Sequence, residues 1–284
     1  MLLEPVPAFD PDKVRELTTA ERRVIRCLQE GGTEALLLNA KELGELSQTS
    51  DATVVRAAQH LGYAGLADLR RALLDRRTEV YVEGMRTSTR ADDVLEDEIR
   101  VAEEGLAKLR EAVGRGKFDD AVEILTNSDR IVWRGVGPSG SLAEYAQLHS
   151  ERIGHRSIAI RHMGTSLADE LLSLNRSDAV VILSYGQVQK ATEVIFNHAQ
   201  NVGASVILIT DRDDADLGRR ADLLLECGRG RAHGFQSHAV TLVLLESLIV
   251  GMAKKDEDRW TRSTGVLNDL RKQIAGRSLD VDTR

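Results

Sequence analysis

The sequence predicts two domains of different class, an all-α bundle of short helices followed by an α/β domain built on a parallel sheet. Residues 1–77 contain only helix-like apolar periodicity, which is interrupted at Gly31-Gly32 and again at residues 47–50. From residue 130 onward, short runs of Val, Ile and Leu alternate with helix-like segments. Runs of this kind are typical of parallel strands that helices cover on both faces.

The domain boundaries follow from this change of pattern. A polar stretch of mixed composition lies between the two parts and is interpreted as a linker. The expected boundaries are a first domain at 1–77, a linker at 78–95, a second domain at 96–258 and a C-terminal tail at 259–284.

Individual elements of the second domain are also expected from the pattern. Strands are predicted at 130–136, 155–161, 178–184, 204–210 and 222–227. Helices are predicted at 96–113, 118–126, 165–175, 190–202 and 236–254.

Composition narrows the class of protein. The 284 residues carry a formal net charge of −7 and a pI of about 5.6, which favours a soluble, mildly acidic protein. The longest apolar run, residues 239–252, contains Glu246 and is shorter than the roughly 18 residues that a membrane span needs. Cys27 and Cys227 fit no metal or redox spacing, so we expect two buried cysteines that are reduced, as in a cytoplasmic protein, and no metal site.

The stretch from Ala40 to Gly62 predicts two short helices joined by a tight turn. Ser50 is placed to cap the second helix, and the small Gly44 allows the two helices to cross closely. The expected shared core is Leu43, Leu46, Val54, Val55, Ala58 and Leu61. This is the pattern of a helix-turn-helix, whose second helix enters the major groove of DNA.

The second of these helices carries polar side chains that can bond base edges or phosphates. We expect Thr49, Ser50, Asp51, Thr53, Arg56 and Gln59 to lie on its outward, DNA-binding face. A small helical bundle without a role in DNA binding has the same spacing, so the pattern alone leaves both interpretations open.

A family resemblance bears on this choice. The fragments "AKEL", "ATVVR" and "LGYAGLADLR" resemble the N-terminal domain of RpiR-type bacterial transcriptional regulators. That resemblance implies DNA binding by residues 1–77. One departure is Gln48, which stands where the family usually has the glycine of the turn.

The stretch "GVGPSG" between a predicted strand and a predicted helix contains the spacing G-x-G-x-x-G at Gly135, Gly137 and Gly140. Backbone N–H groups and a helix N-terminus meet in such a loop, which favours a phosphate. A dinucleotide-binding fold also places an acidic residue at the end of the next strand. Here Arg161 and His162 stand there, so only an NADP-binding interpretation, with Arg161 on the 2′-phosphate, stays open.

The stretches "GVGPSGSLAE", "VVILSYGQVQKATEV" and "GASVILITD" in the second domain resemble the SIS (sugar isomerase) domain. RpiR-type regulators carry this domain after their helix-turn-helix. The resemblance implies a flavodoxin-like, five-stranded parallel sheet that binds phosphorylated sugars. The effector-binding residues expected on this basis are Gly137, Ser139, Ser184, Lys190 and Thr192. The second loop is two residues longer than the usual S-x-S-G-x-T-x-E and lacks its second serine, so another small anionic metabolite, or no ligand at all, stays open.

The sequence therefore favours a regulator that binds a pseudo-palindromic DNA operator as a homodimer or tetramer and senses an anionic metabolite, without a cofactor or a membrane partner. The alternative is an enzyme, either a sugar-phosphate isomerase or an NADP-dependent oxidoreductase. An isomerase needs a positioned base. The candidates for that base are Glu151, His155, His162, His233 and His238. None belongs to a catalytic motif, and structural roles are expected for each, so no catalytic residue is assigned.

Overall fold

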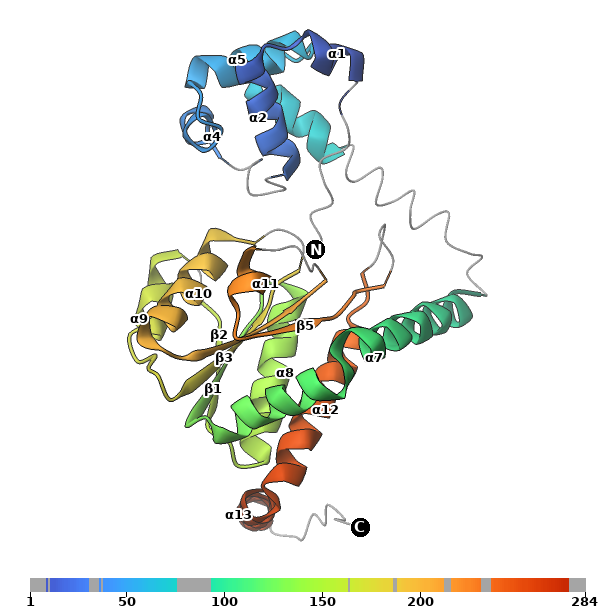
Figure 1. The fold of residues 1–284 in the computed structure, drawn as a ribbon, viewed down its shortest axis with the longest axis vertical. Helices are drawn as coiled ribbons and strands as arrows, with labels where there is room; N and C mark the ends of the chain where they lie inside the picture. The colour runs from blue at the N-terminus through green and yellow to red at the C-terminus, as the bar shows by residue number, and fades with distance from the viewer. Residues whose placement is uncertain are drawn as a thin grey trace. The chain divides into compact units, whose positions relative to one another are not determined.

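The computed structural model describes residues 9, 11–30, 36, 38–75, 93–162, 164–185, 188–211, 216–230 and 236–275. The chain divides into two compact units, which are described separately below (Figure 1). The first unit comprises residues 1–98 and 231–236, and the second comprises 99–230 and 237–284. Within the described ranges, no helix has both the length and the apolar character that crossing a membrane requires.

The first unit is a bundle of short helices. They are α1 (Pro11–Glu16), α2 (Thr19–Glu30), α4 (Ala40–Leu46), α5 (Asp51–His60) and a further helix at residues 66–75. Helices of this length are marginal by themselves, so they depend on a common apolar core. The best-buried members of that core are Val24, Ile25, Leu28, Leu43, Val54, Ala57, Ala58 and Leu69, each exposing 1% or less of its surface.

The expected core of α4 and α5 is mostly confirmed. Leu43, Val54, Ala58 and Leu61 are buried, whereas the expectation is wrong for two neighbours, Leu46 and Val55. Leu46 is 57% exposed and Val55 is 36% exposed. A short helix packed on one side buries a single stripe, and each of these side chains is rotated about 100° away from a buried neighbour.

Side chains of the first unit close the N-termini of its helices. Thr18 and Glu21 bond reciprocally at the start of α2, with both Thr18 donors 2.8 Å from the Glu21 carboxylate. Asn39 and Glu42 form a capping box at α4. The Ser50 hydroxyl accepts the Thr53 N–H at 3.2 Å, which confirms the predicted cap of α5.

The second unit contains a five-stranded parallel sheet in the order β2-β1-β3-β4-β5, so the predicted class and strand positions are confirmed. The strands are β1 (Arg130–Arg134), β2 (Ser157–Ile160), β3 (Asp178–Leu183), β4 (Ser205–Thr210) and β5 (Leu223–Glu226). The helices are α7 (Val94–Asn127), α8 (Pro138–Arg152), α9 (Leu167–Leu171), α10 (Lys190–Val202), α11 (Asp216–Arg220), α12 (Ala239–Lys255) and α13 (Glu257–Ala275).

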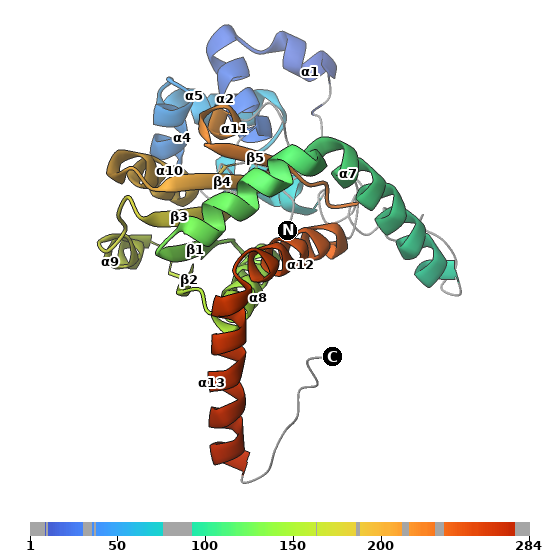
Figure 2. The same cartoon turned by 60° about the horizontal axis from the view of Figure 1, so that its bottom comes forward.

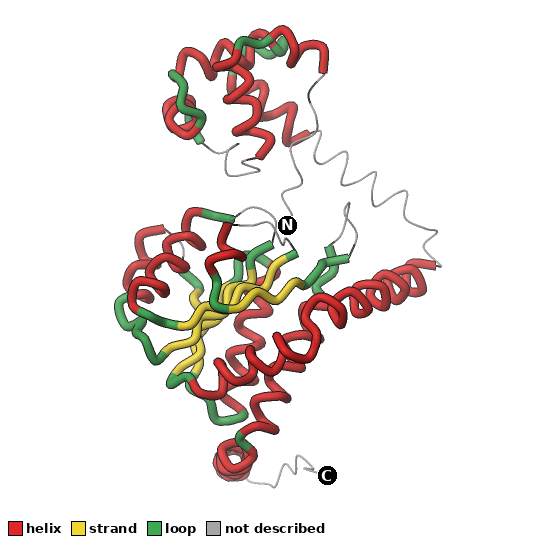
Figure 3. The backbone as a smooth tube through the Cα atoms, viewed as in Figure 1, coloured by secondary structure: helices red, strands yellow, loops and turns green. Residues whose placement is uncertain are grey.

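Two helical layers cover the sheet (Figures 1, 2 and 3). Side chains alternate along a strand, so β1 sends Trp133 to one face and Val132 to the other. Trp133 packs in the cluster shared with α7, α8 and α12, and Val132 packs in the cluster shared with α9, α10 and α11.

Two helices extend beyond the ranges expected for the second domain. Helix α7 begins at Val94, within the expected linker, and is interrupted at Gly114, whose φ of 59° is non-helical. Helix α13 occupies most of the expected tail. It is anchored by Arg259, whose Nη1 lies 2.8 Å from Nδ1 of the buried His155.

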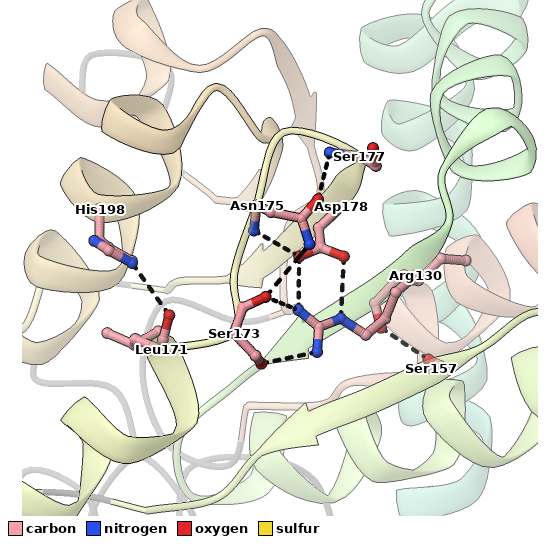
Figure 4. Close-up of polar contacts among 9 residues, drawn as sticks. Arg130, Ser157, Leu171, Ser173, Asn175, Ser177, Asp178 and His198 are labelled. Carbon is pink, nitrogen blue, oxygen red and sulfur yellow. Dashed lines mark hydrogen bonds and ion pairs between the residues drawn. The ribbon is translucent and has the colours of Figure 1, made fainter.

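A polar cluster closes the amino-terminal edge of the sheet (Figure 4). Arg130 of β1 donates from Nε and Nη2 to the two carboxylate oxygens of Asp178 at 3.0 and 2.6 Å. Its Nη1 donates to the hydroxyl of Ser173, and its Nη2 also donates to the carbonyl of Ser173. Asp178 in turn accepts the N–H of Asn175 at 2.9 Å. The carboxylate is therefore buried but fully engaged, as a charge at that depth requires.

Candidate functional sites

The turn between α4 and α5 explains the departure from the usual glycine. Gln48 has a φ of 53°, the left-handed conformation that favours glycine. Hydrogen bonds hold it there, since the Thr49 N–H reaches the Gly44 carbonyl at 2.7 Å and Arg23 of α2 donates to the Gln48 carbonyl at 3.0 Å. The turn thus keeps its geometry without glycine, at the cost of local strain.

Gly44 lies where the two helices of this motif meet. A Cβ atom there would stand 3.1 Å from backbone atoms of Thr49, Ser50 and Asp51. Backbone atoms cannot move aside as flexible side-chain ends can, so only glycine fits without displacing the start of α5. The predicted close approach at Gly44 is confirmed.

Most of the predicted DNA-facing side chains are exposed, namely Ser50, Asp51, Arg56 and Gln59. Thr49 is half-buried, with its hydroxyl 2.9 Å from that of Ser47. The expectation that Thr53 faces outward is wrong, because Thr53 is 8% exposed. Its hydroxyl lies 2.9 Å from the Ser50 hydroxyl and accepts from Arg56 Nη2 at 3.4 Å, so Thr53 positions its neighbours.

In the second unit, the strand order places a topological switch point between β1 and β3. The chain leaves β1 toward β2 on one side and leaves β3 toward β4 on the other, and ligands of parallel α/β sheets bind outside the carboxyl ends of the strands at such a point. The loops that follow these two strands carry the effector residues predicted from the sequence. The fold therefore brings Gly137 and Ser139 to the same edge of the sheet as Ser184, Lys190 and Thr192.

The glycines of the first loop have distinct roles. A Cβ on Gly135 would collide with the carbonyl of Ser139, so this position needs glycine for close packing of strand against helix. Gly137 has φ 59° and ψ −129°, and it precedes Pro138 as the N-cap of α8 without a capping side chain. The positive end of the α8 dipole therefore opens onto the loop.

The second loop leads into α10. Gln189 is the N-cap of that helix, and its side chain makes no capping bond. Lys190 is exposed at the first helical position, Thr192 is 5% exposed, and Ser184 is half-buried. Gly186 and Gln187, which complete the longer loop, lie outside the described residues.

A polar cluster that sequence reasoning did not identify lies at the carboxyl ends of β3, β4 and β5. The Arg229 guanidinium lies 4.2 Å from the centre of the Tyr185 ring and bonds Asp211 at 2.9 Å. The Tyr185 and Thr241 hydroxyls are 2.7 Å apart. The members come from separate loops and from α12, so no local motif could have revealed them.

Burial controls the protonation of this cluster. It raises the pKa of the Tyr185 hydroxyl and of the Cys227 thiol. Burial, together with the Arg229 charge, lowers the pKa of His238 to about 4. All three groups are therefore neutral near pH 7, and the Cys227 thiol is not activated as a nucleophile. Both cysteines are free thiols, with Cys227 buried as expected and Cys27 only half-buried.

The candidate bases of the enzyme alternative have structural partners. Burial and the charge of Arg259 lower the pKa of His155 to about 4, and that arginine holds its ring. His162 pairs with Glu170 at 3.0 Å. Glu151 accepts from Gln147 through its side chain and from Ser263 through its carbonyl. His233 lies outside the described residues.

Arg161, the residue that kept the NADP interpretation open, is 63% exposed and bonds Glu144 of α8 at 3.1 Å. The pair lies on the surface, where an ion pair holds its partners weakly. Within the part of the chain that is described, His, Cys, Asp and Glu form no group that could hold a metal ion.

Comparisons with known proteins match each unit to a family. Residues 12–78 match the helix-turn-helix domain of the rpiR family, and residues 124–253 match the SIS domain. An HTH-type transcriptional regulator of Caldanaerobacter subterraneus subsp. tengcongensis is 24% identical over 268 residues, which cover 90% of this chain and 94% of that protein.

Two further similarities differ in what they cover. The bifunctional protein glk of Burkholderia thailandensis is 27% identical over 84% of this chain, but this chain spans only 38% of its length. The solved structure of Vibrio vulnificus NanR complexed with ManNAc-6P superposes with a TM-score of 0.59 at 20% identity, covering 93% of this chain and 98% of that one. At that identity the superposition establishes a shared fold.

Proposed function

The chain belongs to the RpiR family of transcriptional regulators, which join a helix-turn-helix domain to a SIS domain, and we propose that it binds a pseudo-palindromic operator under the control of a phosphosugar. One observation carries the proposal. The same chain combines an exposed polar face on α5 with two uncapped helix N-termini at the β1/β3 switch point.

For the DNA-binding half, we assign base or phosphate contacts to Ser50, Asp51, Arg56 and Gln59, with Thr49 at the edge of the face. Thr53 acts through the others, because it is buried and bonds both Ser50 and Arg56. A homodimer presents two copies of α5, which matches half-sites about one DNA turn apart.

For the effector half, we assign anion binding to Gly137 and Ser139 of the first loop and to Ser184, Lys190 and Thr192 of the second. Helix N-termini offer N–H donors and a positive dipole end, and Lys190 adds a point charge. The bound sugar phosphate of the NanR complex supports a phosphorylated sugar as the ligand class. The effector controls transcription only if it binds the DNA-competent and incompetent arrangements with different affinity.

We further propose that the protein acts in the cytoplasm and catalyses no reaction of its own. The histidines considered as bases support this, since His155 is held by Arg259 and His162 by Glu170. The regulatory assignment needs no nucleophile or base, only differential binding.

Selection of bound duplexes from a random pool, at fixed salt, tests the operator proposal directly. We expect enrichment of one palindromic sequence by the full chain. Arg56→Ala should weaken binding to that sequence by about 1–3 kcal/mol if the guanidinium contacts a base. Arg56→Lys is the matched control, because it keeps the charge and loses the bidentate geometry that reads a guanine. Failure to enrich any sequence, with and without a panel of sugar phosphates, would refute the proposal.

A further inference from the structure

Strand β1 carries one arginine at each end, and the two side chains project from the same face of the strand. Arg130 is its first residue and Arg134 its last, four positions apart, and alternate side chains share a face. The chain therefore offers an internal comparison between two guanidinium groups in one strand, one at each edge of the sheet.

The edge formed by Nε and Nη2 of an arginine is the one that receives two oxygens of a single carboxylate or phosphate. In Arg130 that edge is occupied. Its Nε and Nη2 donate to the two oxygens of Asp178 (Figure 4). This pair shows how the sheet neutralises an arginine whose only task is structural.

In Arg134 the same edge has no hydrogen-bond partner among the residues that the structure describes. Arg134 is 1% exposed, and its Nη1 donates to the carbonyls of Ile160 and His162 at 3.2 and 3.3 Å. Its Nε and Nη2 are both buried, and neither has a hydrogen-bond partner in the described part of the chain. A buried charge left in this way is costly, because desolvation is not repaid by a counter-ion.

No internal counter-ion is engaged with this edge in the described residues. Burial lowers the pKa of the Arg134 guanidinium, and the charge of Glu170 only partly offsets that effect. The Glu170 carboxylate is itself held by the backbone N–H and the ring of His162, at 3.2 and 3.0 Å. The site is thus suited to a negative group that the described part of the chain does not supply.

The position of the guanidinium points to the effector. Its bonds to Ile160, the last residue of β2, and to His162 beyond it place it at the carboxyl-terminal edge of the sheet. Arg134 also directly precedes the loop that contains Gly137 and Ser139. In parallel α/β sheets, ligands bind outside this edge.

We propose that Arg134 binds an oxyanion of the effector, a phosphate or a carboxylate, through Nε and Nη2. The inference rests on the proposed function in that it adds a residue to the same effector site. It also explains a buried arginine at the end of β1 that has no internal counter-ion among the described residues, since an oxyanion of the effector would neutralise its charge.

The test measures thermal unfolding of the full chain with inorganic phosphate as the probe. The chain contains two tryptophans, Trp133 and Trp260, and both lie in the second unit, so tryptophan fluorescence follows that unit selectively. Phosphate also stabilises proteins by exclusion from their surface. Each titration is therefore compared with chloride at matched ionic strength and with a control variant.

We expect phosphate to raise the Tm of the wild-type protein above the chloride reference and Arg134→Met to lose this increment. The matched control Arg161→Met removes a nearby exposed arginine and should keep it. If Arg134→Met does not fold, Arg134→Lys replaces it, and the increment should fall severalfold because the charge stays while the paired donors are lost. The titration is repeated with acetate in place of phosphate. A larger Tm increment with phosphate indicates a phosphate site, and a larger increment with acetate indicates a carboxylate site.

An Arg134 variant that folds and keeps the full phosphate increment overturns the proposal and leaves Arg134 as a clamp on the end of β2. The absence of any increment in the wild-type protein also overturns it. Neither result decides the operator proposal, because enrichment of a palindromic duplex by the wild-type chain is measured independently of Arg134. Ser139→Ala in the same titration reports separately on the effector residues assigned from the sequence.

Discussion

The helices of the first unit begin differently from the two helices, α8 and α10, that follow the central strands of the second unit. In the first unit, α2, α4 and α5 start on Thr18, Asn39 and Ser50, whose side chains bond the first turn. In the second unit, α8 and α10 start on Gly137 and Gln189 without a side-chain capping bond. Two other helices of this unit do have bonded starts. Ser237 accepts the Ala239 N–H at α12, and Asp256 accepts the Arg259 N–H at α13.

Under the proposed function, this difference separates structural helix ends from those that face the effector. Unpaired N–H groups at a helix start need a side chain, water or a ligand. The first unit satisfies its own donors, as a small bundle that must be rigid before it meets DNA. Helices α8 and α10 of the second unit start without a side-chain cap at the edge where the sheet has a switch point, and Arg130 and Asp178 close the opposite edge.

The largest effect is expected at that closed edge. Asp178→Ala leaves the Arg130 guanidinium largely buried without its carboxylate, which should lower the free energy of unfolding by about 3 kcal/mol. Urea unfolding followed by tryptophan fluorescence measures the change. Asp169→Ala, an exposed carboxylate on α9, is the control and should alter stability by less than about 0.5 kcal/mol. Equal losses in both variants would contradict a structural role specific to this pair.

Removing a cap tests the comparison itself. Ser50→Ala deletes the bond to the Thr53 N–H and should destabilise the first unit by about 1 kcal/mol. Gln189→Ala, at the corresponding position of α10, should change stability by less than about 0.5 kcal/mol because no capping bond is lost. Far-UV circular dichroism during denaturation measures both variants. A loss at Gln189 as large as that at Ser50 would show that the two helix starts are equivalent.

Gln48→Gly should sharpen the contrast by stabilising the first unit. The left-handed backbone at φ 53° costs a non-glycine residue about 1 kcal/mol, and the greater freedom of glycine in the unfolded chain offsets part of this gain. We expect an increase in the denaturation midpoint without a change in operator affinity. A decrease would mean that contacts of the Gln48 side chain outweigh the strain.

The smallest effect concerns pH. Burial would raise the pKa of Glu21, but hydrogen bonds from Thr18 and the contact with His60 outweigh it, so the folded-state pKa is lowered. A lowered pKa contributes stability that is present above the unfolded-state pKa and is lost as pH falls through the folded-state value. The protection factors of α2 and α5 amides against hydrogen exchange, taken relative to the unfolded-chain rate at each pH, should therefore fall in this acidic range. Glu21→Gln should flatten that dependence, and an unchanged profile would exclude Glu21 as its source.

The sequence by itself determined what is local. Apolar periodicity located the helices, Val- and Ile-rich runs located the strands, and Ser50 and Gly44 defined the helix-turn-helix because caps and close crossings depend on neighbours a few residues apart. The same reasoning gave the glycine loop of the second unit. It was wrong at Leu46, Val55 and Thr53, since the stripe that a short helix buries depends on where its neighbours pack.

Only the tertiary structure decided which distant groups meet and which stay unpaired. Arg130 and Asp178 lie 48 positions apart, and the parallel pairing of β1 with β3 brings them together. Arg229 joins Tyr185 and Asp211 for the same reason, at the other edge of the sheet. The open edge of Arg134 has no sequence signature, because burial and a missing counter-ion are properties of the packed sheet and of no local pattern.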